Sequence, residues 1–384
     1  MKIMMKYLFV LSVLAFSLGQ NFPSADNYLT DIHRLIPSFD QTNQYDGPAS
    51  ISSAPITTTI NVTKPTREEM MYYNYYAASV DSPFEVKTMD CVYCPMVKDD
   101  MSQFVVFDNS THDTSVLVAL SDKRKEIVVA FRGSINIWNC ILDVYYINTS
   151  PDGADHIKIH KGFYIATMSL YDRVVEKIIA LRSTKNKNYK LVLTGHSLGA
   201  AMARVTQFLF LHLNQFPGIT MEVYTYGEPR SGNKYYVDFL NSQNVKTSRV
   251  TNRGDVVCHV APTSIVGTEI VTEFYYHALT EYWIDGDQEQ FADQSTYEDP
   301  NLSNSRGPQY MPIDHFSYFD VNYMRMAADL HEWLAIPGVL HPVDVFPPLP
   351  KPIQSWLSDL SDKIVARSKD IRFPIVKPLL PYSP

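Results

Sequence analysis

A serine between two glycines is the part of this 384-residue sequence with the clearest potential for chemistry. Residues 195–199 read Gly-His-Ser-Leu-Gly; they follow the apolar run Leu191–Thr194 and precede small residues that suit a helix. This context predicts a strand, a sharp turn and a helix, with Ser197 lifted clear of the sheet on a strained backbone. The two glycines let the helix and the strand pass closely. The pattern therefore predicts a nucleophilic serine, and the alternative is a tight turn with an inert serine.

A serine hydroxyl is a poor nucleophile at neutral pH, so it needs a histidine to take its proton and a carboxylate to hold that histidine. Asp255 suits the acid because it follows the strand-like run Ser248–Asn252 and two turn residues. In the order serine, acid, histidine, five downstream histidines could be the base: His259, His277, His315, His331 and His341. His315 lies in a loop, whereas His259 shares the loop of Asp255 and His277 lies in a tyrosine-rich run. We therefore predict His315 as the base.

Alternating strand-like and helix-like segments must position these residues. Strand patterns occur at 103–108, 114–120, 126–131, 191–194, 221–226, 248–252 and near 274–283. Helical patterns occur at 67–78, at 163–183, after Gly199 and at 235–240. The segment at 126–131, which is apolar after Glu126, is typical of a strand that is buried on both faces. The alternation predicts an α/β fold of the α/β-hydrolase type, with a mostly parallel central sheet and helices on both faces.

The N-terminal residues predict export. Lys2 and Lys6 precede the apolar run Tyr7–Phe16, and Ser17–Gly19 offers a small-x-small cleavage site, which together indicate a signal peptide over residues 1–19. We therefore expect a secreted, extracellular protein. Sequons at Asn61, Asn109, Asn148 and Asn301 suit a glycoprotein.

Composition divides the remaining chain into three parts. Residues 20–66 are rich in Ser, Thr, Pro, Asn and Asp and are predicted to be a pro-segment or a flexible extension. Residues 67–335 are predicted to be the α/β domain, and residues 336–384 a proline-rich C-terminal extension.

The formal net charge of −8 argues against a nucleic-acid partner. No stretch after the signal peptide is long and apolar enough to predict a transmembrane segment.

The four cysteines allow three disulfide pairings in an oxidising compartment. The short spacing of Cys91 and Cys94 favours a structural disulfide in a secreted chain. Cys140 and Cys258 would then pair with each other or remain free thiols. We expect no metal site, because no His/Cys cluster accompanies these residues at ligand spacing.

The chain resembles the fungal-type class 3 lipases, the family of the triacylglycerol lipases of filamentous fungi and their feruloyl esterase relatives. The motifs that carry the resemblance occur in order between about residues 67 and 330. They are Phe131–Ser134, His160–Phe163, Gly195–Gly199, Tyr226–Asn233, Asn252–Pro262 and Asp314–Phe319. The order of these motifs makes a chance match improbable.

The resemblance implies a role for each matched position. Ser197 would be the nucleophile, Asp255 the acid and His315 the base, while Ser134 and Leu198 would supply the oxyanion hole. The segment after Ser134 would form a short lid that covers a pocket when closed and meets lipid when open. Its apolar residues are Ile135, Ile137, Trp138, Ile141 and Leu142. An ordinary core helix or strand is the alternative for this segment.

The chain departs from the family pattern at three positions. Cys140 follows Asn139 where the family often has Trp, Cys258 follows Val257 where it has Pro, and Glu228 replaces Gln. A disulfide between Cys140 and Cys258 would tie the root of the lid to the loop of the acid.

The implied function is a secreted carboxylic ester hydrolase without a cofactor, which cleaves acylglycerols at a lipid–water interface through an acyl-enzyme. A feruloyl-type esterase or a phospholipase A1 with the same triad is the first alternative. A non-catalytic lipid-binding relative is the second, and it would be expected to lack a member of the triad. The apolar lid favours a lipid substrate over a soluble or aromatic ester.

Overall fold

The computed structural model describes residues 64–82, 84–133, 148–151, 153–182, 186–260, 275–278, 280–292, 297–306 and 311–323. The predicted signal peptide, residues 20–63 of the predicted pro-segment and the C-terminal extension lie outside these ranges. So do Ser134, Cys140 and the lid residues Ile135, Ile137, Trp138, Ile141 and Leu142. The predicted limits of these parts and the predicted lid stay predictions.

An eight-stranded sheet forms the centre of the described part, in the order β1-β2-β3-β6-β7-β8-β9-β10. Its strands are β1 (Gln103–Asn109), β2 (Thr114–Ser121), β3 (Glu126–Phe131), β6 (Lys190–His196), β7 (Met221–Tyr226), β8 (Lys246–Asn252), β9 (Glu281–Asp285) and β10 (Gln288–Ala292). The five strands from β3 to β9 pair in parallel, whereas β1, β2 and β10 pair antiparallel at the edges. The predicted mostly parallel sheet is therefore confirmed.

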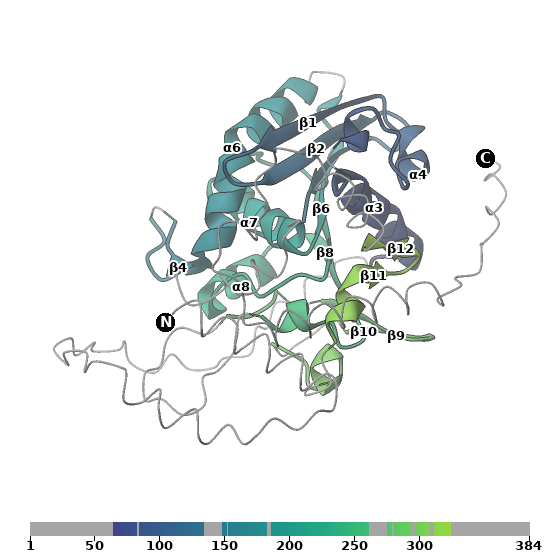
Figure 1. Ribbon diagram of the computed structural model, residues 1–384. Helices are drawn as coiled ribbons and strands as arrows, with labels where there is room; N and C mark the ends of the chain where they lie inside the picture. Colours follow the sequence, from purple (N-terminus) through teal and green to yellow (C-terminus); the bar gives the residue numbers. More distant parts are fainter. Residues whose placement is uncertain are drawn as a thin grey trace, which may run out of the picture. The chain divides into compact units, whose positions relative to one another are not determined.

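Helices cover both faces of this sheet (Figure 1). They are α3 (Arg67–Val80), α6 (Lys161–Leu181), α7 (Leu198–His212) and α8 (Lys234–Asn241), with a single turn, α4 (Pro95–Lys98), beside α3. Successive side chains of a strand point to opposite faces of the sheet, so the core has one cluster on each face. On β2, Val116 and Val118 pack in the cluster of α6, α7 and α8, whereas Leu117 and Ala119 pack in that of α3. The α/β-hydrolase prediction is confirmed by this layered arrangement.

The N-terminal helix α3 begins with a capping box. The hydroxyl of Thr66 accepts the N–H of Glu69, and the carboxylate of Glu69 accepts the N–H of Thr66, which satisfies two amides that no helical carbonyl could reach. The tyrosine-rich face of the helix is predominantly core: Tyr73 and Tyr76 are fully buried against the sheet. Tyr73 also stacks on Tyr224 of β7 with ring centroids 4.4 Å apart. This packing fixes α3 on the sheet.

Short elements complete the described part. Two hairpins, β4 (Asn148–Thr149) with β5 (Ile159–His160) and β11 (Ser317–Tyr318) with β12 (Val321–Asn322), lie outside the main sheet. The single-turn helices are η1 (Glu85–Lys87), η3 (Val256–His259), η4 (Ser303–Arg306) and η5 (Pro312–Phe316). The strand expected near 274–283 begins only at Glu281, because Tyr276 instead bridges to Gly232, away from the sheet. No helix within the described ranges is long and apolar enough to cross a membrane.

Candidate active site

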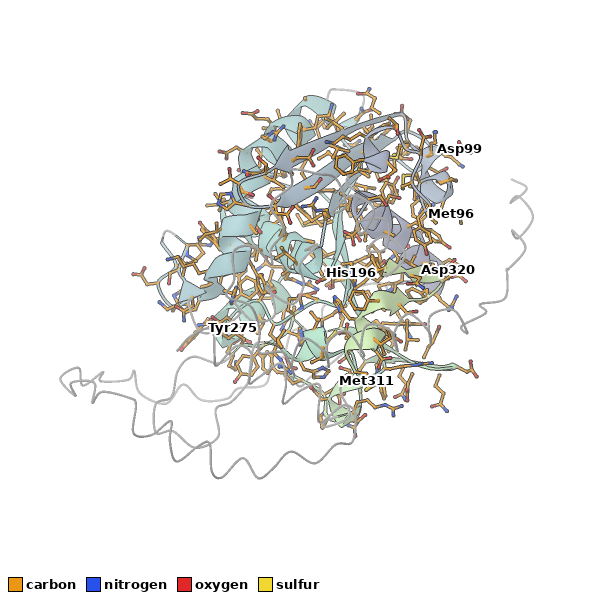
Figure 2. The ribbon with its side chains drawn as sticks, in the orientation of Figure 1. Met96, Asp99, His196, Tyr275, Met311 and Asp320 are labelled. Carbon is orange, nitrogen blue, oxygen red and sulfur yellow. A yellow bond between two sulfur atoms is a disulfide. The ribbon has the colours of Figure 1, made fainter. Side chains whose placement is uncertain are left out.

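The turn between β6 and α7 holds Ser197 in a conformation that few residues adopt. Its backbone has φ 58° and ψ −124°, a region that costs on the order of 1–3 kcal/mol for a residue with a side chain. The Ser197 N–H donates to the carbonyl of Tyr226 on β7 at 2.9 Å, which holds the turn against the sheet. His196, the last residue of β6, lies near the middle of the described part (Figure 2). The predicted strand, turn and helix are all present.

The two flanking glycines are required by the space around the turn. A Cβ atom on Gly195 would lie 2.3 Å from the carbonyl carbon and oxygen of Gly199. A Cβ atom on Gly199 would lie 2.1 Å from the carbonyl oxygen of Phe131 at the end of β3. Neither contact can be relieved by a side-chain rotation, because the atoms met belong to the backbone. The helix and the strands therefore pass as closely as the sequence pattern predicts.

Asp255 and His315, 60 residues apart, meet in the core. His315 Nδ1 donates to Asp255 Oδ2 at 2.8 Å, since an ionised carboxylate can only accept. The same oxygen accepts the hydroxyl of Tyr318, and Oδ1 accepts the N–H of Val257 at 2.8 Å. Both side chains are 1% exposed. The ring of His315 lies 4.4 Å from that of His196, so this acid–histidine pair sits beside the serine turn.

The remaining nitrogen of His315 is available for chemistry. His315 Nε2 is buried and has no hydrogen-bond partner within the described ranges. Because Nδ1 carries the hydrogen that Asp255 accepts, a neutral His315 presents a lone pair at Nε2. The arrangement can therefore accept a proton from a hydroxyl group.

The charge states of the pair suit a base and its orienting acid. Burial raises the pKa of Asp255, but the charge of His315 and the hydrogen bonds from His315, Tyr318 and Val257 outweigh burial and hold this pKa below its usual value. Burial lowers the pKa of His315, and the charge of Asp255 offsets only part of that effect. At neutral pH the pair consequently consists of an aspartate and a neutral imidazole.

Two backbone segments adjoin the serine. Leu198 is the first residue of α7, so no helical carbonyl precedes its N–H, which lies at the positive end of the helix dipole. Gly133 lies on the other side: a Cβ atom there would be 3.1 Å from the carbonyl oxygen of His196 and 3.5 Å from Ser197 Cβ. Ser134, the predicted second donor, follows Gly133 directly but lies outside the described residues.

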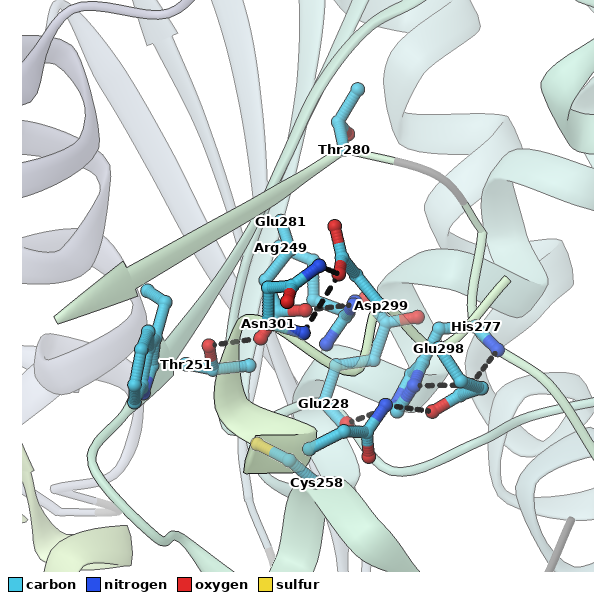
Figure 3. Close-up of polar contacts among 12 residues, drawn as sticks. Glu228, Arg249, Thr251, Cys258, His277, Thr280, Glu281, Glu298, Asp299 and Asn301 are labelled. Atoms are coloured by element: carbon cyan, nitrogen blue, oxygen red, sulfur yellow. Dashed lines mark hydrogen bonds and ion pairs between the residues drawn. The ribbon is translucent and has the colours of Figure 1, made fainter. Parts of the chain in front are cut away.

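The other candidate bases have different surroundings. His277 Nδ1 lies 2.9 Å from Glu298 Oε1 and Nε2 lies 3.0 Å from the carbonyl oxygen of Glu228, so both nitrogens face acceptors (Figure 3). His259 Nδ1 lies 2.9 Å from the carbonyl oxygen of Asp255, which gives it a structural place in the loop of the acid. His331 and His341 lie outside the described residues. Of the described candidates, only His315 contacts the carboxylate of Asp255.

The cysteines correct one prediction. Cys91 and Cys94 form a disulfide, as their spacing favoured. Cys258, however, is a free and buried thiol, so the predicted bond to Cys140 is wrong. The reason is local: Cys258 Sγ lies 3.5 Å from Asp255 Oδ2 and 3.8 Å from the hydroxyl of Tyr318. Burial and the charge of Asp255 raise the pKa of this thiol, which therefore stays protonated beside the acid.

Comparison with known proteins places this geometry in a family. The family described as Lipase (class 3) matches residues 128–265. A secreted mono- and diacylglycerol lipase of Fusarium solani is 30% identical over 291 residues, which are 74% of this chain and 76% of that protein. The chain belongs to the class 3 lipase family. Membership makes it an enzyme of the carboxylic ester hydrolase class.

Two further similar lipases agree with this assignment. A lipase of Rhizomucor miehei is 29% identical over 262 residues, which cover 66% of this chain and 69% of that protein. A solved triacylglycerol lipase, whose catalytic centre is formed by a serine protease triad, is 28% identical with a TM-score of 0.59. The match covers 69% of this chain and 99% of that one.

One departure from the class 3 pattern now has a physical account. Glu228, which stands where the family often has Gln, is fully buried and binds the guanidinium of Arg204 with Nη2 to Oε2 at 2.9 Å. Burial raises the pKa of Glu228, but Arg204 and the hydroxyl of Thr225 outweigh it and keep this pKa low. An ion pair thus anchors the segment directly after Gly227, in the buried network around Arg249, Glu281 and Glu298 (Figure 3).

Three residues of the site were not predicted from the sequence: Gly227 and Tyr318 adjoin the acid–histidine pair, and Asp81 lies beside Gly133 and His196. Gly227 has φ +59°, and a Cβ atom there would lie 2.7 Å from His315 Cε1 and 3.0 Å from Asp255 Oδ2. Tyr318 donates to Asp255, and Asp81 accepts the N–H of Gly133. Gly227 and Tyr318 lie inside motifs of the class 3 family, which was the available signal. Asp81 lies in no motif.

Proposed function

We propose that this protein is a secreted lipase that hydrolyses acylglycerol esters through an acyl-enzyme, with Ser197, Asp255 and His315 as its catalytic triad. The observation that carries the proposal is the buried hydrogen bond from His315 Nδ1 to Asp255 Oδ2 beside the strained turn of Ser197. The charges of the pair support it, because a general base must be neutral at the working pH.

The proposed reaction proceeds in two halves. Ser197 Oγ attacks the ester carbonyl carbon while His315 Nε2 takes its proton, and the N–H groups of Leu198 and Ser134 hold the resulting oxyanion. His315 then gives this proton to the departing alcohol oxygen, which leaves the acyl group on Ser197. In the second half, water attacks the acyl carbon while His315 Nε2 takes a proton from it. His315 then returns this proton to Ser197 Oγ as the fatty acid leaves. Asp255 stays ionised throughout and stabilises the imidazolium.

The acylglycerol substrate is supported by the sequence after Ser134 and by the family. The apolar residues of that segment suit a cover that meets a lipid surface. A feruloyl-type esterase or a phospholipase A1 remains the alternative with the same triad. Export is supported by the N-terminal sequence, by the disulfide Cys91–Cys94 and by the secreted Fusarium solani relative.

A substrate panel tests this proposal. The purified protein and its Ser197→Ala variant, which sets the background, are assayed on a long-chain triacylglycerol emulsion, a diacylglycerol, a phosphatidylcholine vesicle and methyl ferulate. Tributyrin is added below and above its solubility limit. We expect the highest rates on acylglycerols and a steep rise in rate above that limit. Faster hydrolysis of ferulate or phospholipid would select an alternative, and no rate above the Ser197→Ala background would leave only a lipid-binding protein.

The pH profile of hydrolysis should reflect the buried base. The neutral fraction of His315 rises as pH increases through its pKa, so activity is gained across that pKa. Burial lowers this pKa, His196 lowers it further, and Asp255 and Asp81 raise it, with a net shift downward. We expect the acidic limb of kcat/KM for a soluble short-chain ester to lie below about pH 6.5, which is the ordinary pKa of a histidine. A limb clearly above that value would contradict neutral His315 as the base.

Gly227 should be essential to the geometry of the triad. In Gly227→Ala the new methyl group meets His315 and Asp255 at 2.7–3.0 Å, so the pair must separate. We expect kcat to fall by about 10²-fold or more, because small misplacements of catalytic groups are costly. Gly218→Ala is the matched control: Gly218 has a similar φ of +71° but nothing within 4 Å of its Cβ position. Equal kcat values for the two variants would show that the contact with the triad is unimportant.

A further inference from the structure

A second aspartate–histidine pair lies behind the proposed triad, in residues to which the reaction above gives no role. His196 Nδ1 is 3.6 Å from Asp81 Oδ2, and the two side chains are 4% and 14% exposed. The other ring nitrogen, His196 Nε2, donates to the carbonyl oxygen of His315 at 2.9 Å, because a carbonyl can only accept. Asp81 and the proposed base are thus connected through one imidazole ring.

The ring of His196 is fixed on both faces. The ring of Tyr323 stacks on it with centroids 3.7 Å apart and an interplanar angle of 15°. The ring of His315 lies 4.4 Å away at 31°. Tyr323 is itself held by its hydroxyl, which donates to Asn74 of α3, and Asn74 donates to the carbonyl of Tyr318 at 2.8 Å. His196 therefore cannot turn without disturbing the segment that carries His315 and Tyr318.

The same carboxylate also reaches the oxyanion side of the site. Asp81 Oδ1 accepts the N–H of Gly133 at 2.8 Å, and Gly133 directly precedes the proposed oxyanion residue Ser134. Asp81 Oδ2 would be 3.5 Å from a Cβ atom on Gly133, and Ser197 Cβ would be equally close to that atom. One side chain consequently contacts the strand end before Ser134 and the histidine before Ser197.

Stability of the helix does not explain an acid at this position. Asp81 is the C-cap of α3, whose last turn has no basic residue. A negative charge at the C-terminal end of a helix opposes the helix dipole, which favours cations there. The contacts to Gly133 and His196 are what the carboxylate supplies instead.

We propose that Asp81 is a positioning residue of the active site, which aligns the oxyanion-hole backbone through Gly133 and the base through His196. This inference rests on the proposed function, since it assigns Asp81 an effect on the same reaction. Asp81 does not touch the reacting atoms, so its loss should affect the chemical step more than substrate binding.

Three variants of matched exposure test the proposal on a soluble short-chain ester. Asp81→Ala removes both contacts, and Asp81→Asn keeps an oxygen that can accept the N–H of Gly133. Asp100→Ala is the control, because Asp100 is also 14% exposed and accepts the hydroxyl of Tyr72, yet contacts no residue of the site. Each protein is assayed for kcat and KM across pH and for binding of an aryl boronic acid, which forms a tetrahedral anion on serine. Thermal melting shows whether each variant is folded.

We expect Asp81→Ala to lower kcat by about 10- to 100-fold, below the 10²–10³ typical for loss of a whole oxyanion donor. KM should stay within about threefold, boronate binding should weaken in parallel with kcat, and the melting temperature should equal or exceed that of the wild type. Asp81→Asn should restore most of kcat. The acidic limb of its pH profile should move to lower pH, because the charge of Asp81 raises the pKa of His315 in the wild type and asparagine lacks that charge.

An Asp81→Ala variant with the kcat of Asp100→Ala, or an Asp81→Asn variant as slow as Asp81→Ala, would overturn the proposal. If Asp81→Ala does not fold, the comparison is between Asp81→Asn and the wild type. An acidic limb at the same pH in both proteins would then overturn the proposal. Failure of the proposed function is distinct from all of these outcomes, because the wild-type protein itself would then show no hydrolysis above Ser197→Ala.

Discussion

Replacement of His315 by alanine is expected to lower kcat/KM for ester hydrolysis by about 10⁴- to 10⁶-fold, the range found when the base of a serine triad is removed. The buried Nε2 is the atom that would take the proton of Ser197, and no other described histidine contacts the carboxylate of Asp255. The oxyanion hole and substrate binding would leave a small residual rate.

The control for this prediction is His277→Gln. His277 was the other buried candidate, but Glu298 and the carbonyl of Glu228 occupy its two nitrogens. The variant should lose stability, since it breaks a buried network, yet its folded fraction should keep kcat within about tenfold. If His277→Gln lost hydrolysis while His315→Ala kept a near-normal rate, His277 and not His315 would be the base.

Replacement of Asp255 by asparagine is expected to lower kcat by about 10⁴-fold, as in the serine-protease triad, because an amide can stabilise the wrong tautomer of the histidine. The variant should also shift the acidic limb of the pH profile. The charge of Asp255 raises the pKa of His315, so its removal should move the limb to lower pH. The measurement is kcat/KM for the variant and the wild type across a pH range that extends about two units on each side of the ordinary histidine pKa of about 6.5.

Tyr318→Phe provides the comparison for Asp255→Asn. It removes one hydrogen bond to Asp255 Oδ2 while His315 Nδ1 and the N–H of Val257 keep theirs. A loss of about 150-fold or less in kcat is expected, because a single hydrogen bond to a charged group is worth about 1.5–3 kcal/mol and each 1.36 kcal/mol changes a rate about tenfold. An Asp255→Asn variant that is no slower than Tyr318→Phe would contradict the role of Asp255.

The parts of the site that could be predicted are those encoded locally. The glycines at 195 and 199 reveal the turn because backbone atoms of Gly199 and Phe131 leave no room for a Cβ. Asp255 could be predicted because a strand followed by turn residues precedes it. The strand runs of the sheet were predictable for the same reason, since β3 is apolar after Glu126 and buried throughout.

Contacts between distant segments could not be predicted in this way. The disulfide between Cys140 and Cys258 was inferred from the two cysteines left over, but Cys258 is buried against Asp255 and Tyr318. Asp81 precedes Gly133 by 52 residues, and nothing near it in sequence indicates that α3 ends beside the serine turn. The start of β9 was predicted too early, near residue 274. Tyrosine is common in strands, but Tyr276 bridges to Gly232 outside the main sheet.

The central claim is that Ser197 is a nucleophile activated by His315 and Asp255. The most direct test is the rate of covalent labelling by a fluorophosphonate, followed by intact mass and peptide mapping in the wild type, His315→Ala and Asp255→Asn. We expect one adduct per chain, on the peptide that contains Ser197, and labelling slower by at least about 10³-fold in His315→Ala. An adduct on another residue, or an unchanged labelling rate in His315→Ala, would contradict the claim.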